Sequence, residues 1–153
     1  PYLLGIVRPV RGQILMTTPV EPLIDVAGIT EYNYFRQFED GRVLMGGARC
    51  FFEEQEYTAE DVTTPNLLEN LEAYLRRWFA GIDFEVERHW AGIHGFTPDH
   101  RAAVGLIPDE SRIAFALGFS GYGNSIGLLS AERMVELALD GRDPGPLSAA
   151  RFA

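Results

Sequence analysis

Residues 113–125 read IAFALGFSGYGNS, and this stretch decides how the whole sequence is interpreted. Its first five residues, 113–117, form a continuous apolar run, which is typical of a β-strand covered on both faces. The glycine-rich turn after them leads into residues 126–139, whose apolar positions recur at helical spacing up to Asp140-Gly141. The sequence therefore predicts a strand, a tight turn and a helix in direct succession.

The predicted turn and helix start form a place where negative charge can bind. At a helix N-terminus several main-chain amides lack an intrahelical partner, and the helix dipole is positive there. The spacing of Gly121, Gly123 and Gly127 is no dinucleotide fingerprint, since that needs an acidic second strand about 20 residues later, and none follows Leu139. Spacing alone leaves two interpretations. It favours close packing of helix on strand over contact with part of a cofactor whose phosphates are held elsewhere.

Upstream, the sequence predicts a β-hairpin. Asp40-Gly41 separates two β-rich segments, 32–39 and 42–47, and this dipeptide favours a two-residue turn with positive φ at both positions. Because side chains alternate along a strand, one face of the hairpin then carries aromatic rings around a guanidinium. On that face Tyr34, Arg36 and Phe38 lie beside Val43, Met45 and Gly47.

The remaining segments complete an α+β fold, mostly an antiparallel sheet with a packed helix. Residues 4–18 favour an extended segment that enters the sheet, and the acidic residues 50–61 indicate a solvated loop. Thr64-Pro65 is typical of a helix start, and a stripe of apolar residues follows until Gly81. Alternation across residues 83–88 predicts a further, half-exposed strand.

Composition excludes several kinds of chemistry. The chain has 153 residues and a net charge of −9, which disfavours a nucleic-acid backbone or an anionic membrane surface as partner. All thirteen basic residues are arginine, so no lysine is present to form a Schiff base or serve a phosphate-binding P-loop. Cys50 is the single cysteine, no segment is apolar enough to span a membrane, and no targeting leader opens the chain. We therefore expect a cytoplasmic protein.

Four motifs in a fixed order give this sequence a family resemblance. They are Arg11-Gly12-Gln13, then DGRVLMGG at residues 40–47, then Trp90-Ala91-Gly92 with Phe96-Thr97-Pro98-Asp99, and finally GFSGYGN at residues 118–124. In this order they resemble the C-terminal part of the FAD-dependent amine and amino-acid oxidoreductases, the family of glycine oxidase, sarcosine oxidase and D-amino-acid dehydrogenase. The similarity extends over nearly the whole chain.

The resemblance implies that two parts of the chain have different roles. Residues 1–95 would form most of a substrate domain, and residues 96–153 would complete an FAD domain with the last strand, turn and helix. The family's N-terminal nucleotide-binding unit is absent from these residues, so FAD would be held mostly by that missing segment. Arg11 and Gln13 would brace the crossover between the two domains.

The resemblance also implies a reaction, in which hydride passes from the carbon beside an amine nitrogen to flavin. The negative charge of the reduced ring would lie near main-chain amides of residues 123–125, as in an oxyanion hole. Gly92 stands where related enzymes attach flavin through cysteine, which predicts non-covalent FAD. Ser125 stands where they carry lysine, which favours an electron acceptor other than oxygen. The implied cofactor contacts are Gly92, Ser120, Gly121, Tyr122, Gly123, Asn124 and Ser125.

Four residues are candidates for contact with a small amine or amino acid. His94 is the candidate catalytic residue and substrate contact, and its alternative is a hydrogen bond to a loop. Arg36 suits an anionic substrate, although an ion pair with a nearby acid is favoured for it. Tyr34 and Tyr122 complete the set, with Tyr122 alternatively capping the core. Three histidines and a distant cysteine show no metal-ligand spacing, so no metal is predicted.

Three further expectations concern the chain by itself. We expect it to be inactive alone, to expose an apolar patch and to form a homo-oligomer through that patch. The alternative functions are a non-catalytic subunit or binding module that keeps the fold, and a free-standing small-molecule binder with its own enclosed pocket.

Overall fold

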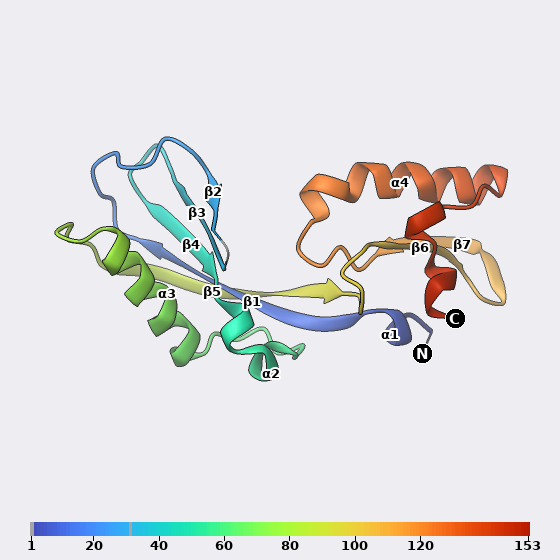
Figure 1. Cartoon of the computed structure of the whole chain (residues 1–153), viewed down its shortest axis with the longest axis horizontal. Coiled ribbons are helices and arrows are strands. Elements are labelled where there is room, and N and C mark those ends of the chain that lie inside the picture. The colour runs from blue at the N-terminus through green and yellow to red at the C-terminus, as the bar shows by residue number, and fades with distance from the viewer. Residues whose placement is uncertain (1, 31) are drawn as a thin grey trace. The chain divides into compact units, whose positions relative to one another are not determined.

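The computed structural model describes residues 2–30 and 32–153 (Figure 1). It contains two compact units, of which one combines Pro1–Val10 with His94–Ala153 and the other is Arg11–Ile93. The boundaries of these units differ from those of the expected domains, 1–95 and 96–153. The difference arises because the residues before Arg11 pack with the C-terminal unit. The functional assignment of the two domains stays a prediction.

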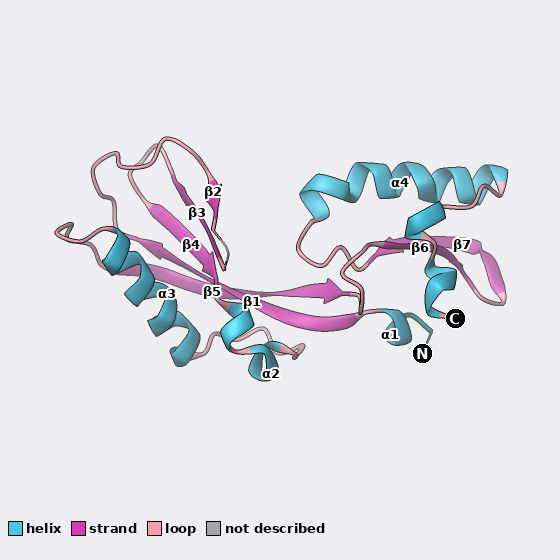
Figure 2. Ribbon diagram, viewed as in Figure 1, coloured by secondary structure: helices cyan, strands magenta, loops and turns pink. Residues whose placement is uncertain are grey.

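A five-stranded sheet dominates Arg11–Ile93, and Figure 2 shows its strands in magenta. Its strand order is β2-β3-β4-β1-β5, and β1 pairs with β4, β4 with β3 and β3 with β2 in antiparallel fashion. The fold class is therefore confirmed as an antiparallel sheet with helices. The strands are β1 (Arg8–Thr17), β2 (Gly28–Ile29), β3 (Asn33–Gln37), β4 (Val43–Gly47) and β5 (Val86–Phe96).

One helix, α3 (Pro65–Trp78), packs against this sheet. Its leucines at positions 67, 71 and 75 recur every four residues and are fully buried with Val43 and Met45 of β4. Each such leucine contributes roughly 1.5–3 kcal/mol by leaving water. The helix ends at Trp78, before Gly81, which instead adopts φ 88° in the following turn. The predicted helix is confirmed, and three leucines of its stripe are buried, whereas Trp78 at its end is 40% exposed.

The hairpin between β3 and β4 differs from its predicted form. The amide of Phe38 donates to the Arg42 carbonyl at 2.8 Å, which closes a three-residue loop in which Gly41 alone has positive φ. The longer loop shifts the register by one residue, so that Phe35 lies opposite Met45 and Tyr34 opposite Gly46. The predicted face was wrong. Tyr34 and Arg36 share a face with Leu44 and Gly46, while Val43 and Met45 point to the core under α3.

The acidic segment after β4 is not simply a solvated loop. It contains the short helices η1 (Arg49–Phe51) and α2 (Glu53–Glu56), and Glu56 is completely buried. Arg11 binds Glu56 with two hydrogen bonds of 2.9 and 3.0 Å, and Gln13 donates to Glu56 at 2.9 Å. This contact raises the pKa of the Arg11 guanidinium. Arg11 and Gln13 therefore hold an internal segment of their own unit, which was not expected.

The C-terminal unit contains a two-stranded sheet and a long helix. Its elements are α1 (Tyr2–Ile6), β6 (Ala103–Ile107), β7 (Glu110–Leu117), α4 (Gly123–Asp140), η2 (Gly145–Leu147) and η3 (Ala149–Phe152). The expected extended segment from residue 4 is wrong at its start, where α1 forms. The predicted strand, turn and helix of residues 113–139 are present. However, Ile113 of β7 is 52% exposed, so this strand is not covered on both faces.

Candidate functional site

The turn between β7 and α4 reverses the chain through an unusual backbone. Gly118, Ser120 and Gly121 have φ values of 70°, 51° and 92°, a region that favours glycine. At Gly118 a side chain is also excluded by contact, because an added Cβ would collide with the Thr97 methyl carbon. The turn thus requires glycine at position 118 and favours it at position 121, whereas Gly123 and Gly127 do not have positive φ.

Ser120 fastens the turn to the end of β5. Its amide donates to the Gly95 carbonyl at 3.0 Å, and its hydroxyl donates to the Gly118 carbonyl at 3.2 Å. The same hydroxyl accepts from the Thr97 amide at 3.3 Å. Ser120 is only 4% exposed, and both of its donors are already engaged, one by Gly95 of β5 and one inside the turn. Direct contact between Ser120 and a cofactor stays a prediction, and its observed contacts hold the turn in place.

The first turn of α4 presents two main-chain donors. Its N-cap, Tyr122, makes no side-chain cap, and the Ser125 amide donates to the Tyr122 carbonyl at 3.0 Å. Gly123 and Asn124 occupy the first two helical positions, where no intrahelical acceptor exists for the amide. The expectation of three open amides is corrected to two, because Ser125 uses its own donor inside the turn.

The two residues that carry these donors line a cavity of about 470 Å³. Its walls come from the end of β5, the end of β7 and the start of α4, and include His94, Gly95, Leu117, Gly118, Gly123 and Asn124. An added Cβ at Gly121 would meet no atom within 4 Å, so a side chain there would project into open space. The site therefore combines amide donors, the positive end of a helix and room for an electron-rich ring.

The cavity brings together several of the predicted site residues. His94, Ser120, Gly121, Gly123 and Asn124 line it. The His94 ring is exposed to solvent and lies edge-on to Phe96 with 6.3 Å between ring centroids. Tyr122 is 60% exposed at the start of α4, so it does not cap the core.

The other predicted site residues, Tyr34, Arg36 and Gly92, belong to the unit Arg11–Ile93. The Tyr34 ring lies over Gly46, where an added Cβ would collide with it, and burial raises the pKa of its hydroxyl. The Arg36 guanidinium lies 5.1 Å from the centroid of the Phe38 ring. Over residues 2–30 and 32–153 no salt bridge involves Arg36, so the favoured ion pair is not the arrangement found.

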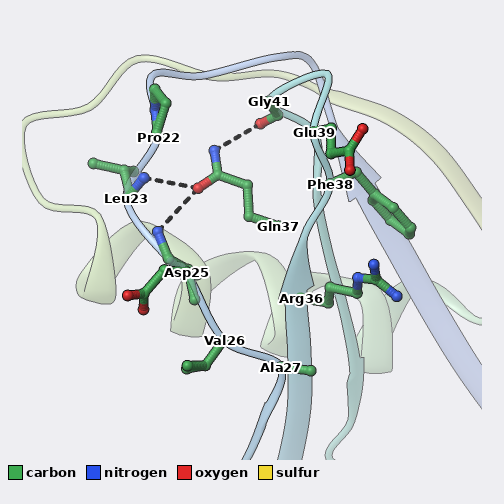
Figure 3. Close-up of a pocket in the computed structure, with 11 residues that line it drawn as sticks. Pro22, Leu23, Asp25, Val26, Ala27, Arg36, Gln37, Phe38, Glu39 and Gly41 are labelled. Atoms are coloured by element: carbon green, nitrogen blue, oxygen red, sulfur yellow. Dashed lines mark hydrogen bonds between the residues drawn. The ribbon is translucent and has the colours of Figure 1, made fainter.

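Sequence reasoning missed Gln37, which organises a groove of about 810 Å³ beside the hairpin. Its carboxamide oxygen accepts from the Leu23 and Ile24 amides at 2.7 and 3.0 Å, and its nitrogen donates to the Gly41 carbonyl at 3.0 Å. Figure 3 shows that Arg36 and Asp25 point away from one another at this groove. The sequence feature that could have revealed this role was a polar residue on the inward face of β3.

No described helix is both long and apolar enough to cross a membrane. Among the residues that the structure describes, no three histidine, cysteine, aspartate or glutamate side chains gather as a metal site.

Comparison with known proteins identifies the class of protein. The model of the FAD dependent oxidoreductase family matches residues 2–137. The chain belongs to this family, which agrees with the strand, turn and helix arrangement at its candidate site.

Three individual relatives show how similar this chain is to known proteins. The monomeric sarcosine oxidase of Bacillus sp. (strain NS-129) is 29% identical over 79 residues, which are 52% of this chain and 20% of that protein. Among solved structures, glycine oxidase from Geobacillus kaustophilus matches 95% of this chain with a TM-score of 0.72 at 19% identity. L-proline dehydrogenase from P. horikoshii matches 92% with a TM-score of 0.70 at 23% identity. These structural matches establish a shared fold.

The chain is much shorter than the proteins it matches. It covers 40% of the glycine oxidase chain and 38% of the L-proline dehydrogenase chain. The activity of a whole enzyme is therefore a matter for proposal.

Proposed function

We propose that this chain is the part of an FAD-dependent amine or amino-acid oxidoreductase that contacts the edge of the flavin ring and helps to form the substrate pocket. One observation carries the proposal. The amides of Gly123 and Asn124 start α4 without intrahelical acceptors, and both residues line the cavity at the end of β7. The remainder of the FAD site would come from a nucleotide-binding segment outside these 153 residues.

The chain's contribution to the reaction is electrostatic. When bound, FAD would accept hydride from the carbon beside the amine nitrogen of the substrate. The two amides and the positive end of α4 would stabilise the negative charge that develops at the ring edge. A donor placed for such charge contributes about 3–4 kcal/mol to transition-state stabilisation. Gly92 offers no side chain for attachment, which supports non-covalent binding.

Four residues are proposed to contact the substrate. His94 lines the cavity and is the proposed catalytic residue. Tyr122, the N-cap of α4, is a further proposed substrate contact. Arg36 is the proposed partner of a substrate carboxylate, because no salt bridge engages its guanidinium among the described residues, and Tyr34 lies on the same sheet face. We also propose that the protein is cytoplasmic and that its electron acceptor is not oxygen.

The test joins this chain to an FAD-binding segment of a relative and measures flavin absorption and its bleaching by amines and amino acids without oxygen. We expect a yellow protein that is reduced by at least one such substrate. A colourless folded protein contradicts the proposal. A yellow protein that no amine or amino acid reduces supports the non-catalytic binding module instead.

Substitutions on α4 locate the contact. Gly123→Ala adds a methyl group at ordinary distance, 3.7 Å from the Phe119 Cβ, so the fold should persist. The methyl group would crowd the approach to the amides, and we expect FAD affinity to fall about tenfold or more, the effect of one lost hydrogen bond. Gly127→Ala is the matched control, because its added Cβ meets nothing within 4 Å. Unchanged affinity in Gly123→Ala would place the flavin elsewhere.

A further inference from the structure

Arg151, near the C-terminal end of the chain, makes an extensive set of hydrogen bonds. Its guanidinium donates to both carboxylate oxygens of Asp99, at 2.8 and 3.2 Å. It also donates to the carbonyls of Arg101 at 2.8 Å, Ala102 at 3.0 Å and Ser148 at 2.8 Å. One side chain on η3 thus binds a carboxylate and three main-chain carbonyls, and it is only 18% exposed.

The segment that Arg151 holds, residues 97–102, is a tight loop. The Asp99 carboxylate accepts from the Arg101 amide at 3.2 Å, and the His100 amide donates to the Thr97 carbonyl at 3.1 Å. The Thr97 hydroxyl donates to the Arg101 carbonyl at 2.8 Å. Arg151 and Thr97 therefore share one acceptor, the Arg101 carbonyl, which ties the arginine directly to Thr97.

Thr97 connects this loop to the turn at the candidate site. Its amide donates to the Ser120 hydroxyl at 3.3 Å, and its methyl carbon packs against Gly118. Both of these turn residues have positive φ, so the turn depends on such contacts to keep its shape. A continuous set of contacts runs from Arg151 through Thr97 to the residues just before the amides of Gly123 and Asn124.

We propose that Arg151 is a positioning residue for the turn 118–121, acting through the loop 97–102. Its guanidinium fixes the loop, the loop fixes Thr97, and Thr97 holds Ser120 and Gly118 in the conformation that presents the α4 amides to the cavity. The consequence for flavin rests on the proposed function. The positioning itself concerns only residues of this chain and is tested without cofactor.

The chemistry of this contact calls for arginine. A planar guanidinium donates in several directions at once, whereas the ammonium group of lysine acts as a point charge. Lysine at position 151 could pair with Asp99 but could not also bind the carbonyls in this geometry. Asp99 has a second cationic partner, since the Arg101 guanidinium donates to it at 2.9 Å. We therefore expect the carbonyl contacts to matter more than the charge.

Amide hydrogen exchange of the whole chain, without flavin, tests the proposal residue by residue. In Arg151→Ala we expect the amides of Thr97 and Ser120 to exchange at least about tenfold faster, because their local opening becomes easier. Amides of the β6 and β7 pairing should keep their rates. Arg151→Lys should exchange nearly as fast as Arg151→Ala. The matched control is Arg142→Ala, which removes an arginine that is 66% exposed and pairs with Glu136, and it should leave Thr97 and Ser120 unchanged.

Three results would overturn the positioning role. They are unchanged exchange at Thr97 and Ser120 in Arg151→Ala, an equal increase at all amides of the unit, and full protection in Arg151→Lys. If Arg151→Ala fails to fold, Arg151→Lys replaces it, since lysine keeps a positive charge beside Asp99 but loses the contacts to the carbonyls. Faster exchange at Thr97 and Ser120 then supports the proposal, and unchanged exchange contradicts it. A failure to bind FAD would affect the proposed function alone.

Discussion

At the scale of single residues, position 118 requires glycine for two independent reasons. Its φ of 70° lies in the left-handed region, and its Cα faces the Thr97 methyl carbon too closely for any side chain. Gly127, also near the start of α4, meets neither condition, since it lies in open space on the helix. The same residue type therefore has opposite consequences at two positions nine residues apart.

Alanine substitutions separate these two glycines. Gly118→Ala should lower the free energy of unfolding by about 2 kcal/mol or more, because backbone strain and a steric clash add. Gly127→Ala should leave it unchanged or raise it by up to about 1 kcal/mol, because alanine favours a helix interior. Urea denaturation of the two variants measures both changes. A stable Gly118→Ala protein would mean that the turn differs from the one described.

The buried pair of Arg11 and Glu56 allows a second residue-level prediction. Glu56→Ala should lower the free energy of unfolding by about 3–5 kcal/mol, because it leaves Arg11 charged and buried without its acid. The control is Glu54→Ala, which removes an exposed carboxylate from the same short helix. Denaturant titration compares the two variants, and similar losses would show that the pair is not essential.

At the scale of secondary-structure elements, the sequence correctly predicted the elements that a local residue pattern determines. The strand, turn and helix of residues 113–139 and the stripe of α3 depend on spacing that is visible in a short window. The hairpin strands were also predicted, but Asp40-Gly41 suits both a two-residue and a three-residue loop. The choice between them depends on which residues of β3 and β4 pack under α3. No local signal specified that choice.

Two features of the structure could not be predicted from the local sequence pattern. Glu56 is buried because Arg11, 45 residues away, binds it, and an acidic run gives no sign of such a partner. The Ser125 amide is used inside the turn because the first turn of α4 is tightly wound. The glycine pattern predicted where the donors would lie, and only the structure showed which of them remain open.

The loop held by η3 predicts a pH dependence. Hydrogen bonds from Arg151 hold the pKa of Asp99 well below its usual range, whereas the unfolded value is about 3.9. Because the folded pKa is the lower one, this carboxylate stabilises the fold fully above the unfolded pKa, and the contribution is lost as pH falls through the folded pKa. Stability should decline below about pH 5.

Urea denaturation at a series of pH values measures this decline. Asp99→Asn should be less stable than the native chain at neutral pH and should show a flatter curve in acid. Asp25→Asn, on an exposed loop of the other unit, should keep the native slope. Parallel curves for Asp99→Asn and the native chain would exclude Asp99 as a source of the acid sensitivity.

At the scale of the whole molecule, one helix surface remains apolar and exposed. Leu128 and Leu139 of α4 are 88% and 79% exposed, and Val135 between them is 49% exposed. Their spacing of seven and four residues places them on one side of the helix. Exposed surfaces of this kind promote association.

We therefore expect the isolated chain to self-associate through α4. Light scattering should show species larger than a monomer, and the double substitution Leu128→Glu with Leu139→Glu should shift the distribution towards monomer. Leu4→Glu, at a residue of α1 in the same unit that is 78% exposed, is the control. A monomer at high concentration, or equal dispersal by the control, would exclude α4 as the contact surface.

The two long strands give the chain a modular construction. β1 and β5 are neighbours in the sheet, and each runs from one compact unit into the other. Adjacent strands lie only about 5 Å apart, so the chain enters and leaves Arg11–Ile93 at nearly the same point. That unit is connected as an insertion, and a hairpin of two or three residues would bridge the gap left by its removal. Exchange of this insertion between related proteins would replace α3 and most of the five-stranded sheet while keeping the turn and α4 of the other unit intact.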